Sequence, residues 1–266
     1  MVTVFSSTGC IRCRIVKAYL TEHGIAYKEY DVKTVEGSAA FKMFYREHRA
    51  SVHRDAQGIF FPVVQDGDVI VQDAGVSLAW FMQGDRLLGY VQPNNLGHGW
   101  TGGLRVPPAS LGQNESFLEL VGTLKKGGLQ TEVTTDGENA ALLDTLLREK
   151  LIDRLIFEIW GRKDSLQPEP DHDREESLKA AVLHAGDADI RFVMDMAWFM
   201  NHEQTVPDPA VVGKAAESVR NSTGVSNIPC VIFDSSKSVS NLFPYRTAVR
   251  RWIARTELYT NDDNHA

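Results

Sequence analysis

Cysteine is scarce in this chain, since only three of the 266 residues are cysteine. A small secreted domain held together by disulfides contains far more, so that class of protein is excluded. Two of the three stand together as Cys10-Ile-Arg-Cys13, and a lone Cys-x-x-Cys of this kind indicates redox or metal chemistry.

Long apolar runs are also missing. No window approaches the ~18 consecutive apolar residues that a membrane-spanning helix needs. Residues 1–8 lack the basic start and apolar stretch of a signal peptide. We therefore expect no membrane partner and a cytoplasmic protein.

Positive charge is in deficit, with a net charge of -7. An acidic chain has no electrostatic reason to bind nucleic acid or an anionic membrane. Basic residues cluster once, on one side of a helix expected at 243–257, and this cluster indicates a solvated helix face. Its members are Arg246, Arg250, Arg251 and Arg255.

The length of the chain is sufficient for two ordinary domains.

The first 84 residues alternate between strand and helix patterns. β-branched and aromatic runs predict strands, while apolar residues three to four apart predict helices. The predicted elements are a strand at 2–5, a helix at 11–23, a strand at 25–32, a helix at 39–48, strands at 60–64 and 69–71, and a helix at 76–82.

Cys10 and Cys13 have the spacing of a redox pair. Cys10 stands at the start of the predicted helix 11–23, where unpaired N–H groups and the helix dipole favour a thiolate. Arg12 and Arg14 add positive charge in the same turn. Cys13 lies one turn further along and should be the more buried thiol. Cys10 would attack a disulfide, and Cys13 would resolve the mixed disulfide.

Three features in this order resemble the glutaredoxin family: Cys10-x-x-Cys13, then Phe61-Pro62-Val63, then Asp73-Ala74-Gly75-Val76-Ser77. The resemblance covers residues 1–84 and implies a thioredoxin-like fold with thiol–disulfide oxidoreductase activity. It also implies a cis bond before Pro62 and pairing of the Phe61 backbone with the substrate. The residues expected to bind substrate are Arg12, Phe61, Pro62, Asp73, Ala74 and Gly75.

The family's contacts with glutathione are incomplete here. Many glutaredoxins carry a lysine shortly before the first cysteine, but residues 5–9 are uncharged. Asp73 adds negative charge near the expected position of a glutathione carboxylate. Arg12 or Lys33 could substitute for the lysine, since an exposed ion pair contributes only ~0.2–1 kcal/mol. We expect poor use of glutathione and a preference for a protein reductase or another small thiol.

Zinc is the main competing interpretation of the cysteine pair, and it requires two further ligands. The nearby His23, His48 and His53 have no paired-ligand spacing, and Cys230 lies in the other half of the chain. Cluster binding by a glutaredoxin dimer usually accompanies a single cysteine. A redox dithiol without metal or cofactor is therefore the favoured interpretation.

The second half repeats strands and helices after a connector at 85–96. Alternation of this length predicts a parallel sheet with helices packed outside it, in an open sheet or a partial barrel. Residues 118–121, 128–137 and 151–154 resemble the middle of a radical S-adenosylmethionine activating enzyme, which implies a partial βα barrel. That family holds an iron–sulfur cluster with three cysteines, and residues 85–229 contain none. We therefore expect a degenerate domain at 97–258 with no cofactor, followed by a polar tail at 259–266.

Other residues of this half could carry chemistry, although a structural role is favoured for each. Cys230 lies in an apolar strand pattern and suits the core better than a third redox thiol. Asp171-His172-Asp173 contains residue types that bind metal ions, but it lies in an acidic, proline-rich loop. Four acidic residues are expected near the C-terminal ends of strands, where α/β folds place ligands: Glu132, Asp136, Glu158 and Asp195. His98 and Trp100 flank the start of the sheet.

The overall prediction is a two-domain α/β protein that reduces protein or small mixed disulfides, with the second domain selecting the partner. Glutathione or another thiol could be the co-substrate, and a reductase would supply electrons. The alternative is a redox-gated binding module, in which the second domain binds a protein or metabolite and the dithiol only modulates it.

Overall fold

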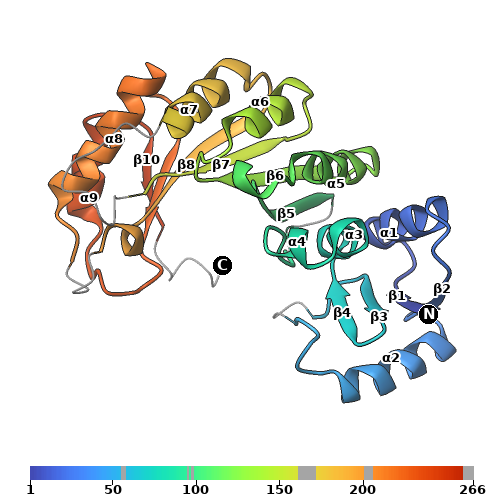
Figure 1. The fold of residues 1–266 in the computed structure, drawn as a ribbon. Helices are drawn as coiled ribbons and strands as arrows, with labels where there is room; N and C mark the ends of the chain where they lie inside the picture. The colour runs from blue at the N-terminus through green and yellow to red at the C-terminus, as the bar shows by residue number, and fades with distance from the viewer. Residues whose placement is uncertain (55–57, 95, 97–98, 161–171, 201–205, 260–266) are drawn as a thin grey trace. The chain divides into compact units, whose positions relative to one another are not determined.

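The computed structural model describes residues 1–54, 58–94, 96, 99–160, 172–200 and 206–259 (Figure 1). The chain divides into two compact units, Met1–Val133 and Thr134–Ala266. The sequence placed the division at 85–96 instead. Residues beyond this predicted connector join the first unit because helix α5 (Asn114–Lys126) packs against helix α3 (Ala74–Gln83).

The first unit begins with a four-stranded sheet in the order β2-β1-β3-β4. Its strands are β1 (Val2–Ser6), β2 (Tyr27–Asp31), β3 (Val63–Asp66) and β4 (Val69–Gln72). Strand β1 runs parallel to β2 and antiparallel to β3, and β3 and β4 form a hairpin. The apolar side chains of Val4, Val63 and Val64 are fully buried, as the strand patterns predict.

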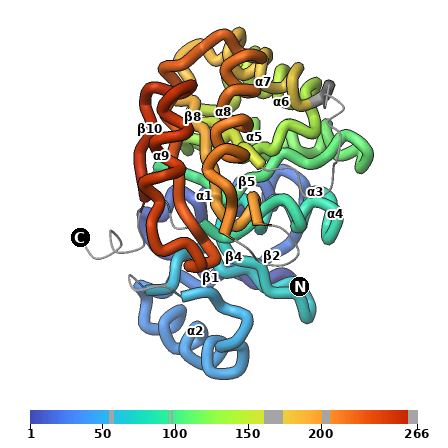
Figure 2. Tube along the Cα trace, turned by 90° about the vertical axis from the view of Figure 1, so that its left-hand side faces the viewer, coloured from blue at the N-terminus to red at the C-terminus, as the bar shows by residue number. Residues whose placement is uncertain are grey.

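Helices cover both faces of this sheet. Helices α1 (Ile11–Glu22) and α3 lie on one side, and α2 (Val35–Glu47) lies on the other (Figure 1, Figure 2). Side-chain caps define the helix starts, as when Thr34 accepts a hydrogen bond from the Gly37 N–H at 3.0 Å. Phe5, Phe41 and Phe44 pack together between the sheet and α2. This is the order of elements that the sequence predicted.

The chain after α3 folds back over the same unit. A short helix α4 (Asp85–Leu88) leads to strand β5 (Trp100–Arg105), and Val91 bridges Leu104. The Gln92 N–H donates to the Gly103 carbonyl at 2.8 Å, and Gly103 has φ +70 and no room for a Cβ. A 3-10 turn (Ala109–Leu111), α5 and strand β6 (Gln130–Thr135) follow.

The second sheet has six strands in the order β10-β9-β8-β7-β6-β5. Its remaining strands are β7 (Arg154–Glu158), β8 (Asp189–Asp195), β9 (Cys230–Phe233) and β10 (Thr256–Leu258). The pairs β7–β8, β8–β9 and β9–β10 are parallel. Between the strands run α6 (Ala140–Arg148), α7 (His172–His184), the 3-10 turn Met196–Phe199, α8 (Pro209–Thr223) and α9 (Phe243–Arg250). The predicted α/β class is confirmed, with a thioredoxin-like domain and a second parallel-sheet domain.

The end of the chain corrects one prediction. The helix expected at 243–257 stops at Arg250, and β10 follows as an edge strand. Thr256 pairs with Cys230, and its carbonyl accepts a hydrogen bond from Arg246 at 3.2 Å. The expected basic helix face is therefore wrong, because Arg255 lies beyond the helix, directly before β10. No helix within the described ranges is both long and apolar enough to cross a membrane.

Candidate thiol–disulfide site

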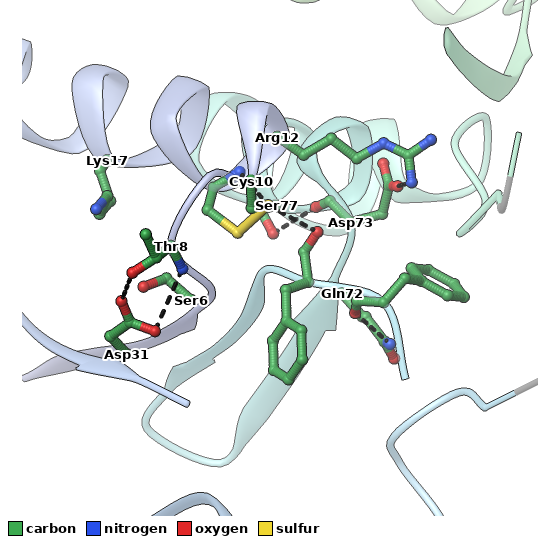
Figure 3. Close-up of a disulfide and its surroundings, with 12 residues drawn as sticks. Ser6, Thr8, Cys10, Arg12, Lys17, Asp31, Gln72, Asp73 and Ser77 are labelled. Carbon is green, nitrogen blue, oxygen red and sulfur yellow. Dashed lines mark hydrogen bonds and ion pairs between the residues drawn. A yellow bond between two sulfur atoms is a disulfide. The ribbon is translucent and has the colours of Figure 1, made fainter. Parts of the chain in front are cut away.

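Cys10 and Cys13 form a disulfide at the start of α1 (Figure 3). Gly9 has φ +85, which favours glycine, and it turns the chain from β1 into the helix. Cys10 is the N-cap residue, and its sulfur accepts a hydrogen bond from the Cys13 N–H at 3.1 Å. Cys10 is half-buried, whereas only 1% of Cys13 is exposed. The more accessible sulfur is thus the one that the helix terminus contacts.

The Phe61-Pro62 segment lies beside this sulfur. The Cys10 Sγ is 3.6 Å from the Phe61 carbonyl oxygen, and the Phe61–Pro62 peptide bond is cis. Pro62 is buried and its carbonyl accepts a hydrogen bond from the Asp73 N–H at 2.9 Å. Phe61 is half-buried, and its carbonyl contacts the Cys10 sulfur directly.

Arg12 points away from the disulfide toward Asp73 (Figure 3). Its guanidinium lies 3.2 Å from the Asp73 carboxylate and donates to the carbonyls of Leu96 and Trp100 at 2.7 and 2.6 Å. Asp73 caps α3 by accepting the Gly75 N–H at 3.0 Å. Burial raises the pKa of Asp73 to about 6, although the Arg12 charge opposes this shift.

Four of the residues predicted to bind substrate are therefore covered by the chain itself. Arg12, Asp73, Ala74 and Gly75 are all buried. A Cβ built on Gly75 would lie 3.2 Å from the Val91 side chain and 3.6 Å from that of Leu104. The Asp73 charge is held by Arg12 rather than facing solvent, so the expected repulsion of a bound carboxylate does not arise.

A pocket of about 400 Å³ opens on the other side of the disulfide. It is lined by Cys10 and Cys13 and by the charged residues Arg14, Lys17, Glu29 and Asp31. Figure 3 shows Thr8, Lys17 and Asp31 on this side and Arg12 and Asp73 on the opposite one. Sequence reasoning missed the acidic residues, because only the parallel pairing of β1 with β2 brings Asp31 beside Ser6.

Most of the pocket's charge is already satisfied. Lys17 pairs with Glu29 at 2.6 Å, and the Ser6 hydroxyl donates to the same carboxylate at 2.5 Å. Burial opposes ionisation of Glu29, but these hydrogen bonds outweigh it and the pKa of Glu29 is lowered. Hydrogen bonds from the Thr8 hydroxyl, and then from the Lys33 N–H, lower the pKa of Asp31.

Arg14 differs from these groups. It is exposed, and among the described residues its side chain makes one hydrogen bond, a long one of 3.5 Å to the Gly127 carbonyl. Because a guanidinium offers five N–H donors, most of its binding capacity is unused.

Comparison with known proteins gives one family match, and it covers the segment that contains Cys10 and Cys13. Residues 2–69 match the glutaredoxin family model. The first unit contains a glutaredoxin domain. The comparison with curated proteins found no match.

Two solved structures show a weaker likeness. NrdH-redoxin, a glutaredoxin-like protein from Escherichia coli, is 20% identical over 35% of this chain and 96% of its own, with a TM-score of 0.22. The carboxyl transferase domain of Rhizobium etli pyruvate carboxylase is 12% identical over 53% of this chain and 29% of its own, with a TM-score of 0.24. The fold assignment rests on the family match and the strand order.

Outside the glutaredoxin domain, the one remaining cysteine is inaccessible. Cys230 is fully buried in β9, and burial raises the pKa of its thiol to about 12. Among the described residues, no group of three or more His, Cys, Asp or Glu side chains is placed to hold a metal ion. His98, Asp171 and the side chains of His172 and Asp173 lie outside what the structure describes.

The acidic residues near strand ends have mainly structural partners. Asp195 is buried and accepts the N–H groups of Ala197 and Ser235 at 3.0 and 2.9 Å. Glu158 is buried and accepts the indole N–H of Trp160 at 3.0 Å. The acidic residues Glu132 and Asp136 are half-buried, and so is Trp100, which was expected to flank the start of the sheet.

Proposed function

We propose that this protein is a thiol–disulfide oxidoreductase that reduces protein or small mixed disulfides through Cys10 and Cys13. The observation that carries the proposal is the pair itself, with a half-buried Cys10 capping a helix and a buried Cys13 one turn further on. The backbone N–H that reaches the Cys10 sulfur would stabilise a thiolate there.

The reaction transfers two electrons from the dithiol to the substrate. The Cys10 thiolate attacks one sulfur of a disulfide R–S–S–R′, so that a Cys10–S–S–R bond forms and R′S⁻ leaves and takes a proton from solvent. Cys13 then loses its proton to solvent and attacks the Cys10 sulfur, which releases RS⁻ and forms the observed disulfide. Two further thiols, or one dithiol of a reductase, restore the reduced pair by the same exchange.

We also propose that glutathione is a poor electron donor for this protein and that a protein reductase or another small thiol serves instead. Support comes from the burial of Arg12, Asp73 and Gly75 beneath residues of the chain itself. The assay is turnover of bis(2-hydroxyethyl) disulfide with glutathione and glutathione reductase, against thioredoxin and thioredoxin reductase. Turnover with glutathione at the rate of an ordinary dithiol glutaredoxin would contradict this proposal.

In this proposal the C-terminal domain expected at 97–258 selects or holds the partner of a cytoplasmic enzyme. Its strands follow one another in sequence order across the sheet, which is also the order of a partial βα barrel. Its one cysteine is buried, so we assign it no redox step. The alternative remains a redox-gated binding module, and it differs by predicting no catalytic turnover of any disulfide.

The experiment that tests the function compares Cys10→Ser with Cys13→Ser in the full chain. Cys10→Ser should abolish exchange, because the attacking thiolate is gone. Cys13→Ser should still attack but accumulate mixed disulfides, which intact-mass spectrometry detects. Faster alkylation of Cys13 than of Cys10 in the reduced protein would reverse the roles, and an absence of turnover would favour the binding module.

A further inference from the structure

A pocket lined by Arg14, Lys17, Glu29 and Asp31 opens beside Cys10, on one side of the disulfide. We propose that this pocket binds the moiety attached to the attacked sulfur, that the preferred substrates carry a carboxylate there, and that Arg14 is its contact. The inference rests on the proposed thiol–disulfide exchange and names the substrate class for the same site.

The opposite side of the disulfide is closed by the chain itself. Arg12 and Asp73 form a buried ion pair there, and the carbonyls of Leu96 and Trp100 complete the coordination of the guanidinium. Gly75 lies under Val91, with 3.2 Å between the valine side chain and a Cβ built on the glycine. Among the described residues on that side, the charges of Arg12 and Asp73 are therefore already paired with each other.

The open side has the size of a ligand site. Its volume of about 400 Å³ falls within the ~300–1,000 Å³ range of small-molecule pockets. Both Cys10 and Cys13 line it, so a group bound there lies next to the sulfur that reacts. The pocket belongs to one unit, because all its lining residues come from β1, α1, β2 and the turn between β1 and α1.

The charges of the pocket decide which ligand it suits. The carboxylate of Glu29 is neutralised by Lys17, and that of Asp31 accepts hydrogen bonds from Thr8 and Lys33. A cationic ligand would have to compete with those donors. The side chain of Arg14 is exposed and, within the described part of the chain, makes only the long hydrogen bond to the Gly127 carbonyl. Its guanidinium N–H groups are therefore available to a carboxylate.

The step needs no reagent beyond those of the proposed reaction. The Cys10 thiolate forms a bond to the substrate sulfur whose attached carboxylate contacts Arg14, and the other sulfur leaves as a thiolate that takes a proton from solvent. Cys13 then displaces the bound thiol from Cys10. Arg14 acts in recognition and is not oxidised or reduced.

The test measures oxidation of the pre-reduced full-length protein in single turnovers, so that no reductase is involved. Three small disulfides serve as probes: 3,3′-dithiodipropionate with two carboxylates, neutral bis(2-hydroxyethyl) disulfide, and cationic cystamine. Each rate constant is divided by the rate of the same probe with free dithiothreitol, which removes intrinsic reactivity. Acid quenching, alkylation and mass spectrometry report formation of the Cys10–Cys13 disulfide.

We expect the normalised rate for the carboxylate probe to exceed that for the neutral probe about fivefold, the upper range for a partly exposed ion pair. Arg14→Ala should bring the ratio near one, Arg14→Glu should reverse it in favour of cystamine, and Arg14→Lys should retain part of it. Arg46→Ala, at an exposed arginine on α2 outside the pocket, is the matched control and should leave the ratio unchanged.

A carboxylate could come from a small thiol or from an acidic residue beside a target cysteine. A second arm therefore compares two peptide disulfides that differ by Asp or Asn next to the cysteine. An Arg14-dependent preference in either arm supports the proposal and identifies the source. Equal ratios in wild type and Arg14→Ala in both arms would overturn it. Failure of every probe to oxidise the pair faster than it oxidises dithiothreitol would instead overturn the proposed function.

Discussion

Replacing Arg12 with methionine tests the buried ion pair most directly. Methionine keeps the length and much of the apolar volume of the side chain but removes the charge and the donors. The Asp73 carboxylate, which is 2% exposed, would lose its partner, and the carbonyls of Leu96 and Trp100 would lose a donor each. The free energy of unfolding of the first unit should therefore fall.

The magnitude follows from the state of Asp73. Its pKa is already about 6 with Arg12 present, so at pH 7 protonation of an unpaired Asp73 costs about 1.4 kcal/mol. Each buried carbonyl that loses its hydrogen bond adds roughly 1 kcal/mol. The sum of about 3 kcal/mol at pH 7 agrees with the ~3–5 kcal/mol typical of breaking one side of a buried pair.

The pH dependence of the effect gives a sharper test. At pH 5 Asp73 is already mostly protonated in the folded protein, so removing Arg12 should cost only about 2 kcal/mol, from the two carbonyls. The double variant Arg12→Met/Asp73→Asn should recover the part of the loss that comes from the charge. Asparagine keeps an oxygen for the Gly75 N–H, so the cap of α3 is preserved in this control.

Hydrogen exchange of the full-length protein, read by mass spectrometry, measures the loss locally. The amides of Gln92 and Arg105, which bond to the Gly103 and Tyr90 carbonyls, should exchange about 100-fold faster than in wild type at pH 7. Exchange rates in Arg12→Met equal to those of wild type at both pH values would refute this reasoning. So would an acceleration of exchange at pH 5 as large as that at pH 7.

Three further predictions follow. Asp73→Asn should remove a pH-dependent cost. Because the folded pKa of about 6 lies above the ordinary 3.8, the stability of wild type relative to this variant should fall by up to about 3 kcal/mol between pH 4 and 7, and denaturant titration of both proteins at several pH values measures this difference. Cys230 should resist iodoacetamide at pH 8 in the native protein and react only after unfolding, and fast native labelling would contradict its burial. Gly127→Ala, directly after α5, should lower the melting temperature, since the new Cβ would lie 2.3 Å from the Ile15 side chain. Gly122→Ala, inside α5, has free space and should be neutral or stabilising; equal melting temperatures would contradict the packing.

Some of this architecture was readable from local pattern alone. The order of strands and helices in residues 1–84, the helix opening at Cys10 and the greater burial of Cys13 follow from hydrophobic periodicity and capping chemistry. These features depend on residues within a few positions of one another. The alternation of the second half likewise predicted its parallel sheet.

Local pattern was ambiguous where two structures suit the same residues. Residues 251–258 contain apolar positions compatible with a continued helix, yet Thr256 pairs with Cys230 and the segment becomes an edge strand. The unpaired edge of β9 decides this, since its backbone groups need partners, and the sequence of the last segment contains no sign of that edge.

The surroundings of the disulfide depended on tertiary structure. Arg12 and Asp73 lie far apart in sequence, and the chain around Val91 covers them, so residues expected to meet substrate became part of the interior. The pocket arises in the same way, because parallel pairing of β1 and β2 places Asp31 beside the turn before Cys10. The sequence by itself determined which cysteine caps helix α1 and which one is buried. Only long-range packing decided that Arg12 and Asp73 near the disulfide are buried and that Arg14 is exposed.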